Sequence, residues 1–294
     1  MRRAVALLAV FLAVPACRRD RSGSGVAASS AGGTAGENAE AVVTGKTGKV
    51  QVLRAVDGSV EEAKVGDRLS VRDALRTEVG EADVAVDGVR VRLHEGSRLE
   101  LKQVGKQNLR ARVRGSVESE VAQKGKLDVE IENSDAIAHS EGGHFFVTAD
   151  GRGVVAVASV TGTVNVSGGG KSIEVNKGQV TRLTRTDPHP TVPVEALRRV
   201  LLNVQWPNQR ETNKATLPIA GRVEPGSRVF VQGEPVAVGE GGMFRTEVPL
   251  RQGRQKIAVV TVDALGRRKQ VESIVLRDDS LPDVKVKKRL WQWR

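Results

Sequence analysis

Residues 82–101 read ADVAVDGVRVRLHEGSRLEL, and this stretch decides the fold class. Apolar residues alternate in it with polar or charged residues, which places one side chain toward a core and the next toward solvent, as in a half-buried strand. Asp87-Gly88 separates the first two alternating runs, and Glu95-Gly96-Ser97 precedes the third. Glycine reaches the backbone angles that tight turns require. We therefore predict three short strands joined by turns.

The same rhythm of short valine-rich strands and glycine turns extends on both sides of this stretch. It covers residues 45–186 and resumes over residues 217–279. Hydrophobic residues make up 39% of the chain but aromatic residues only 3%, so the core must be built from Val, Leu, Ile and Ala. Strands at this spacing indicate an all-β protein with two domains, the second of which has the length of a small sandwich.

A linker separates the two predicted domains at residues 187–216. It begins with DPHPTVP, whose three prolines exclude regular structure. Residues 194–202 have helical spacing, with Glu195 four positions before Arg199, and we predict a short helix there. We expect the two domains to fold independently on either side of this linker.

The N-terminus has the pattern of an export signal. Met-Arg-Arg is followed by an unbroken apolar run at residues 4–16 and then by Cys17, the only cysteine. The run is too short for a membrane-spanning helix, which needs roughly 20 residues, and its composition is typical of a secretory signal. One interpretation is a plain secretory signal, in which Cys17 is incidental and carries no lipid.

The tetrad Val14-Pro15-Ala16-Cys17 resembles the bacterial lipobox, which implies a lipid-modified Cys17 that anchors the protein to a membrane. Arg18 rather than aspartate follows the cysteine, which by resemblance to the enterobacterial sorting rule favours the outer membrane, facing the periplasm. Residues 18–44 are rich in Gly, Ser and Ala and lack bulky core residues. We predict that they form a disordered tether.

The first domain, residues 45–186, resembles a FecR domain, the periplasmic sensor module named for the ferric-dicitrate regulator. The positions that carry the resemblance are Gly66-Asp67, Arg76-Thr77, Asp87-Gly88, Ser97, Leu99, Phe145 to Val147 and Lys177-Gly178. His144 stands where the family has threonine. The FecR regulator itself joins this module to a cytoplasmic domain through a transmembrane helix. We recognise neither in this sequence, so the resemblance implies a fold more than a signalling mechanism.

The second domain resembles a bacterial immunoglobulin-like repeat of the kind found in envelope proteins. Its most telling positions are Phe244 after a glycine turn and Asp263 before Gly266. The resemblance implies a β-sandwich that serves as a spacer or an adhesion module. The expected fold class is thus all-β, with a FecR-like domain of many short strands followed by a small Ig-like sandwich.

The sequence shows no pattern typical of a catalytic site, and we predict no enzymatic activity and no cofactor. Four histidines occur at positions 94, 139, 144 and 189. His139 and His144, with Glu141 between them, could bind a metal if they lay together. Exposed histidines in a loop are the simpler interpretation, and we predict no metal site.

The chain carries a net charge of +11, which favours anionic partners. Basic residues are dense in the tail at residues 280–294. Export argues against nucleic acid, so we expect an envelope protein or an anionic polymer as partner. A contact with an anionic surface would use tail residues Lys285, Lys287, Lys288, Arg289, Trp291, Trp293 and Arg294. The alternative is that the tail packs its tryptophans on the second domain.

These features predict a non-catalytic lipoprotein of the cell envelope that acts by binding or scaffolding. Two alternatives stay open. The first is a sensor or regulatory accessory subunit of an envelope signalling system. The second is an accessory factor for envelope polysaccharide handling.

Overall fold

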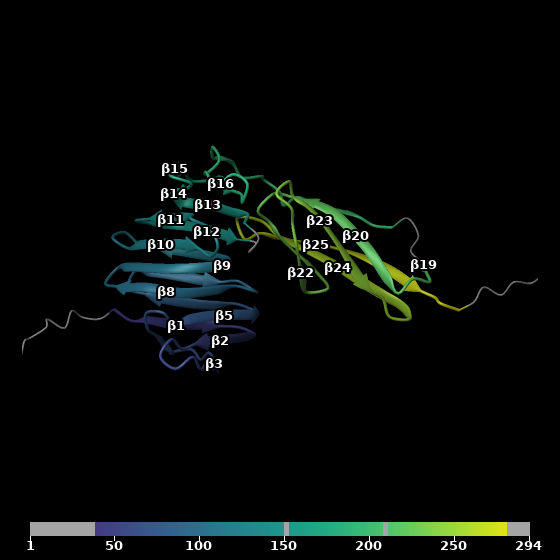
Figure 1. Ribbon diagram of the computed structural model, residues 1–294, viewed down its shortest axis with the longest axis horizontal. Coiled ribbons are helices and arrows are strands. Elements are labelled where there is room, and N and C mark those ends of the chain that lie inside the picture. The colour runs from purple at the N-terminus through teal and green to yellow at the C-terminus, as the bar shows by residue number, and fades with distance from the viewer. Residues whose placement is uncertain (1–38, 150–152, 208–210, 281–294) are drawn as a thin grey trace, which may run out of the picture. The chain divides into compact units, whose positions relative to one another are not determined.

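The computed structural model describes residues 39–149, 153–207 and 211–280. Every regular element in these ranges is a strand, which confirms the predicted all-β class (Figure 1). The strands form two sandwiches, one built from residues 41–195 and one from residues 202–277. Among the described residues, no helix is long and apolar enough to cross a membrane.

The first sandwich consists of two sheets, here named sheet A and sheet B, that share one long strand, β9 (Asn108–Val121). In spatial order, sheet A contains β4 (Arg68–Leu69), β1 (Ala41–Lys46), β6 (Ala82–Val86), β7 (Val89–Leu93), β9, β12 (Gly143–Ala149), β13 (Val155–Gly162), β16 (Gln179–Leu183) and β17 (Val194–Glu195). In spatial order, sheet B contains β3 (Val60–Glu62), β2 (Lys49–Leu53), β5 (Ala74–Val79), β8 (Arg98–Gly105), β9, β10 (Lys126–Ile131), β11 (Ile137–Ser140), β14 (Val164–Gly168) and β15 (Lys171–Val175).

Strand β9 passes from one sheet to the other at Gly115. Its first half pairs with β8 and β10 in sheet B, and its second half pairs with β7 and β12 in sheet A. Gly115 has a φ of +95°, and a Cβ atom there would lie 2.7 Å from the Cα of Ser97. Only glycine fits this crossing. Any other residue would have a strained backbone at this φ, and its Cβ atom would clash with Ser97.

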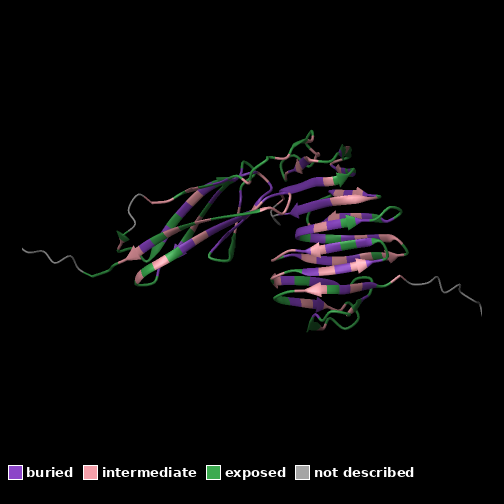
Figure 2. Ribbon diagram, turned by 180° about the vertical axis from the view of Figure 1, so that it is seen from behind, coloured by how far each residue is buried: buried purple, intermediate pink, exposed green. Residues whose placement is uncertain are grey.

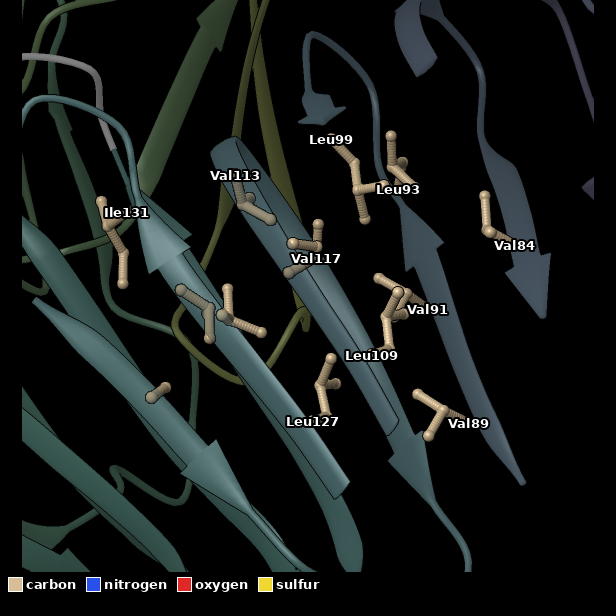
Figure 3. Packing of buried hydrophobic residues seen from close by; sticks show 14 of the residues in the cluster. Val84, Val89, Val91, Leu93, Leu99, Leu109, Val113, Val117, Leu127 and Ile131 are labelled. Atoms are coloured by element: carbon tan, nitrogen blue, oxygen red, sulfur yellow. The ribbon is translucent and has the colours of Figure 1, made fainter. Parts of the chain in front are cut away.

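One apolar core fills the space between sheets A and B. Figure 2 shows buried residues alternating with intermediate or exposed ones along the strands of this sandwich, as the sequence predicts. Figure 3 shows how valines and leucines from β6, β7, β8, β9 and β10 meet in this core. Phe145 is its one fully buried aromatic side chain, so aliphatic packing provides most of the burial free energy.

A chain of buried hydroxyl groups fastens the crossing of β9. Thr77 Oγ1 donates to the carbonyl of His94 at 2.6 Å and accepts from the backbone N–H of Ser97 at 2.9 Å. Ser97 Oγ in turn accepts from the N–H of Ser116 and donates to its carbonyl. Thr77 and Ser97 are two of the residues on which the family resemblance depends. Their hydroxyl groups satisfy the carbonyl of His94 and the N–H groups of Ser97 and Ser116 at this crossing.

The second sandwich also has two sheets. The smaller sheet contains β18 (Leu202–Gln205), β20 (Thr216–Val223) and β23 (Met243–Pro249) in spatial order. The larger sheet contains β19 (Glu211–Thr212), β25 (Arg268–Arg277), β24 (Gly253–Val262), β21 (Arg228–Val231) and β22 (Glu234–Val236) in spatial order. A separate core that includes Ile219, Phe244 and Ile257 joins the two sheets.

Three boundaries differ from the sequence predictions. The tether was predicted to reach residue 44, but β1 begins at Ala41 and buries Ala41 and Val43, so residues 41–44 belong to the first sandwich. The helix predicted at residues 194–202 is wrong, since β17 pairs with β16 and β18 pairs with β20. The stretch between the two sandwiches therefore shortens to residues 196–201.

Candidate functional site

The residues predicted for lipid attachment and for surface contact lie outside the described part of the structure. This applies to Cys17 and to the tail residues from Lys285 to Arg294. Within the described residues, the candidate sites lie on the two outer faces of the first sandwich, where strands fix the direction of each side chain.

The structure does not bring His139 and His144 together as a pair. His139 belongs to β11 of sheet B, and its Nδ1 lies 2.6 Å from Asp128 Oδ1. His144 belongs to β12 of sheet A, and its Nε2 lies 2.7 Å from Glu118 Oε1. Each histidine thus has its own carboxylate partner, and the two do not lie together as a metal site shared by this pair would require.

The outer face of sheet B carries three arginines in a direct row. Arg76 of β5 lies opposite Arg98 of β8, and Arg98 lies opposite Arg114 of β9. All three point away from the core because their sequence neighbours Leu75, Leu99 and Val113 are fully buried. Adjacent strands are about 4.8 Å apart, so the row spans roughly 10 Å. We name these three residues the arginine row.

The arginine row is only partly neutralised. Arg76 Nη2 lies 3.0 Å from Glu78 Oε1, but Glu78 also binds Lys49 at 2.6 Å. The pKa of Glu78 is lowered chiefly by the hydrogen bond from Lys49, against a smaller opposing effect of desolvation, with further lowering by Arg76. Glu78 is thus an ionised carboxylate shared by two cations, and it leaves the row with an excess of positive charge.

Arg98 and Arg114 make no ion pair and no side-chain hydrogen bond with any residue that the structure describes. The Nε atom of Arg98 is buried and lacks a hydrogen-bond partner there. An unpaired buried donor costs free energy, and like charges directly opposite on neighbouring strands repel each other. The arrangement is therefore unfavourable for the isolated protein.

In the neighbouring row on the same face, positive and negative side chains neutralise each other. Glu100 of β8 lies opposite Arg112 of β9, which lies opposite Glu130 of β10. Glu130 accepts from Arg112 at 3.1 Å and from Arg110 at 2.6 Å, and Glu100 accepts from Lys102 at 2.6 Å. Opposite charges alternate in this row, whereas they do not in the arginine row.

An unneutralised row of guanidinium groups can bind an anion. Each guanidinium offers paired donors that match phosphate, sulfate or carboxylate. The sequence pattern predicted short strands throughout residues 45–186 but assigned no role to their outward cations. Alternation in LRARVRG is the signal that could have revealed Arg114, but placing it beside Arg98 and Arg76 requires the strand register.

No protein-family model matches the chain, and no curated protein matches it. Among solved structures, two crystal structures from Parabacteroides distasonis are similar, each described as a candidate anti-sigma factor. One is 17% identical, covers 47% of this chain and 75% of that chain, and has a TM-score of 0.37. The other is 14% identical, covers 61% of this chain and 85% of that chain, and has a TM-score of 0.39.

A third similar structure is a polysaccharide lyase. It is 13% identical, covers 83% of this chain and 40% of that chain, and has a TM-score of 0.21. Structural neighbours of the chain are thus described as candidate anti-sigma factors and as a lyase. Likeness at these values does not assign an activity to this protein.

Proposed function

We propose that this protein is a non-catalytic binding protein of the cell envelope whose ligand is an anionic envelope polymer, held at the arginine row. The observation that carries the proposal is the direct alignment of Arg76, Arg98 and Arg114 without enough acidic partners. Lipid on Cys17 would retain the protein at the membrane, most simply the outer membrane facing the periplasm.

The polymer is favoured over a protein partner by the geometry of the row. Guanidinium groups that follow one another at the strand spacing suit a chain with repeated phosphate, sulfate or carboxylate groups. A bound anionic chain would also remove the repulsion between the arginines, so that part of the binding free energy comes from relief of an unfavourable arrangement in the free protein.

Co-sedimentation of the purified protein with isolated cell envelope tests the proposal. Arg114→Gln should weaken envelope binding about 3-fold to 10-fold at low salt, as expected for loss of one charge-assisted contact on an exposed face. High salt should weaken binding of the wild type, because exposed charges are screened. Arg112→Gln is the matched control, since Arg112 is already paired with Glu130.

Equal effects of Arg112→Gln and Arg114→Gln would show that only total charge matters and would contradict the proposal. Lipid attachment is tested separately: Cys17→Ser should release the protein into the soluble periplasmic fraction. Retention of the Cys17→Ser protein in the membrane fraction would mean that Cys17 is not the anchor.

The alternative of a sensor or regulatory accessory subunit rests on the resemblance of the first domain to FecR domains. It predicts that deletion of the gene changes transcription in response to an outer signal. An accessory role in polysaccharide handling is compatible with the proposed ligand, and it predicts altered envelope polysaccharide on deletion. An unchanged transcriptome together with reduced envelope binding of Arg114→Gln would favour the binding role.

A further inference from the structure

The outer face of sheet A carries a second polar cluster, on the opposite side of the core from the arginine row. Arg92, Glu118 and Phe146 lie directly opposite one another on β7, β9 and β12. Two residues along each strand, Arg90, Glu120 and His144 form a parallel row on the same face. All six side chains point outward, since Val91, Val117 and Phe145 next to them are buried in the core.

Two histidines and two glutamates converge in this cluster. His144 Nε2 lies 2.7 Å from Glu118 Oε1, and His94 Nε2 lies 3.9 Å from Glu118 Oε2. One ligand atom each of Glu118, Glu120 and His144 lies within 4.8 Å of the others, whereas His94 is outside this group and approaches it at Glu118. Tetrahedral zinc with bonds of about 2.0–2.1 Å separates neighbouring ligand atoms by about 3.3 Å. The two measured histidine–carboxylate distances lie on either side of that value.

His94 is oriented as a metal ligand would be. Its Nδ1 lies 2.9 Å from Glu81 Oε1, which fixes the ring and directs Nε2 toward Glu118. That Nε2 atom is buried and has no hydrogen-bond partner among the described residues. In metal-binding histidines, one ring nitrogen commonly donates to a carboxylate and the other nitrogen binds the metal. His94 has the first of these contacts, and its second nitrogen is free of hydrogen bonds within the described residues.

Phe146 restricts both imidazole rings. The ring of His94 stacks on it at a centroid distance of 6.2 Å, with an angle of 14° between the planes. The ring of His144 lies 5.3 Å from it, tilted by 42°. Because Phe146 is itself 7% exposed, it gives the two histidines a fixed apolar wall. Held rings reduce the entropy that metal binding would cost.

The charges of the cluster leave room for a divalent cation. Its carboxylates are Glu81, Asp83, Glu118 and Glu120, and its permanent cations are Arg90 and Arg92. Asp83 is matched by Arg92 at 2.8 Å, and Glu120 is matched more loosely by Arg90 at 3.6 Å. Counted over these carboxylates and arginines alone, two negative charges are not balanced. A bound divalent ion would supply both positive charges at once.

We propose that Glu118, Glu120 and His144 bind one Zn²⁺ ion. His94 is the additional ligand, reaching the ion on the side of Glu118 Oε2, and Glu81 is its positioning residue. Two imidazoles with carboxylates favour zinc over Mg²⁺ or Ca²⁺, which prefer oxygen ligands. A depression of ≈ 560 Å³, lined in part by Arg90, Glu120 and His144, gives ions access to Glu120 and His144. The proposal is independent of the arginine row, which lies on the other sheet.

Titration calorimetry with ZnCl₂ on the purified protein without a histidine tag tests the proposal. The wild type should bind one Zn²⁺, and a large excess of Mg²⁺ should not displace it. His144→Ala and Glu118→Gln should each weaken binding by at least about 10-fold, and Glu81→Gln by about 10-fold to 100-fold, as for outer-shell partners. Circular dichroism establishes that each variant is folded, and Glu120→Gln replaces any variant that is not.

His139→Ala is the matched control. His139 also has two carboxylates nearby, Asp128 at 2.6 Å and Glu141 at 3.7 Å, but it lacks a second histidine. Its loss should change zinc affinity less than about 2-fold, since it lies outside the cluster. Absence of zinc binding to the wild type, equal losses in His139→Ala and His144→Ala, or displacement by Mg²⁺ would each overturn the proposal.

Discussion

At the scale of single residues, Arg98 and Arg114 decide whether the arginine row destabilises the folded protein or leaves its stability unchanged. If the row is unfavourable in the free protein, removing one charge from it should stabilise the fold. We predict that Arg98→Gln raises the melting temperature of the first sandwich by about 2–4 °C, which corresponds to about 1 kcal/mol for a domain of this size. Thermal unfolding followed by circular dichroism at low salt measures the change.

The control for this prediction is Arg112→Gln, which removes the same charge from a row of alternating sign. It should lower the melting temperature slightly, because Glu130 then loses one of its partners. A lower melting temperature for Arg98→Gln as well would mean that Arg98 stabilises the fold, for instance through packing of its alkyl chain, and that the row is not a cost to the free protein.

Asp73 illustrates a residue whose role is structural. Only 2% of it is exposed, and its carboxylate accepts from the N–H groups of Ala55 at 2.8 Å and Ser70 at 3.0 Å and from Arg54 at 3.1 Å. Burial acts to raise the pKa of Asp73, but the three hydrogen bonds outweigh it, and the pKa lies below its usual value. Its stabilising contribution is therefore present above the unfolded pKa of about 3.9 and is lost as the pH falls through the folded value.

We predict that Asp73→Asn lowers the free energy of unfolding by about 1–3 kcal/mol at pH 7. The difference from the wild type should shrink below about pH 4, where the wild-type carboxylate becomes protonated. Urea unfolding at a series of pH values measures both effects. Asp87→Asn is the control, because Asn-Gly serves the tight turn at Gly88 as well as Asp-Gly does. A difference that does not change with pH would contradict the assignment.

At the scale of elements, the fold of the first sandwich depends on the passage of β9 between sheets. A Cβ atom at Gly115 would meet Ser97 and the carbonyl of Gly96 at less than 3 Å. We predict that Gly115→Ala lowers the free energy of unfolding by roughly 2–4 kcal/mol, from backbone strain and overpacking together. Chemical denaturation measures the loss.

Gly105→Ala provides the comparison for Gly115→Ala. Gly105 ends β8, and the nearest atom to an added Cβ there lies at an ordinary contact distance of 3.7 Å. Its substitution should change the free energy of unfolding by less than about 1 kcal/mol. Similar effects at both positions would mean that the crossing of β9 tolerates a side chain.

The elements that could be predicted from sequence are those with strict alternation and a turn of defined chemistry. The hairpin at Asp87-Gly88 is one, since Val86 pairs with Val89 and Gly88 has a φ of +79°. The helix expected at residues 194–202 failed because the pairing of Val194 with Val180 and of Leu202 with Val223 outweighs local helical spacing. The sequence also does not predict which residues of neighbouring strands lie opposite each other. Neither the arginine row nor the cluster at Glu118 could therefore be predicted from it.

At the scale of the whole molecule, the structure narrows the stretch between the two sandwiches to residues 196–201. Strand β17 belongs to the first sandwich and β18 to the second. Arg198 and Arg199 are exposed within this stretch. We predict that limited trypsin digestion cleaves after one of them first and yields two resistant fragments. Mass spectrometry of the fragments identifies the site, and early cleavage inside either sandwich would contradict the assigned boundary.

The arginine row, as we propose it, binds an anionic polymer through the position of its charges and not through total charge. The most direct measurement compares the affinities of two double variants for dextran sulfate at low salt. Arg98→Gln with Arg114→Gln removes two charges from the row, whereas Arg110→Gln with Arg112→Gln removes two charges paired with Glu130. We predict that the first pair weakens binding about 10-fold or more and the second less than about 3-fold. Equal losses in the two double variants would contradict the proposal.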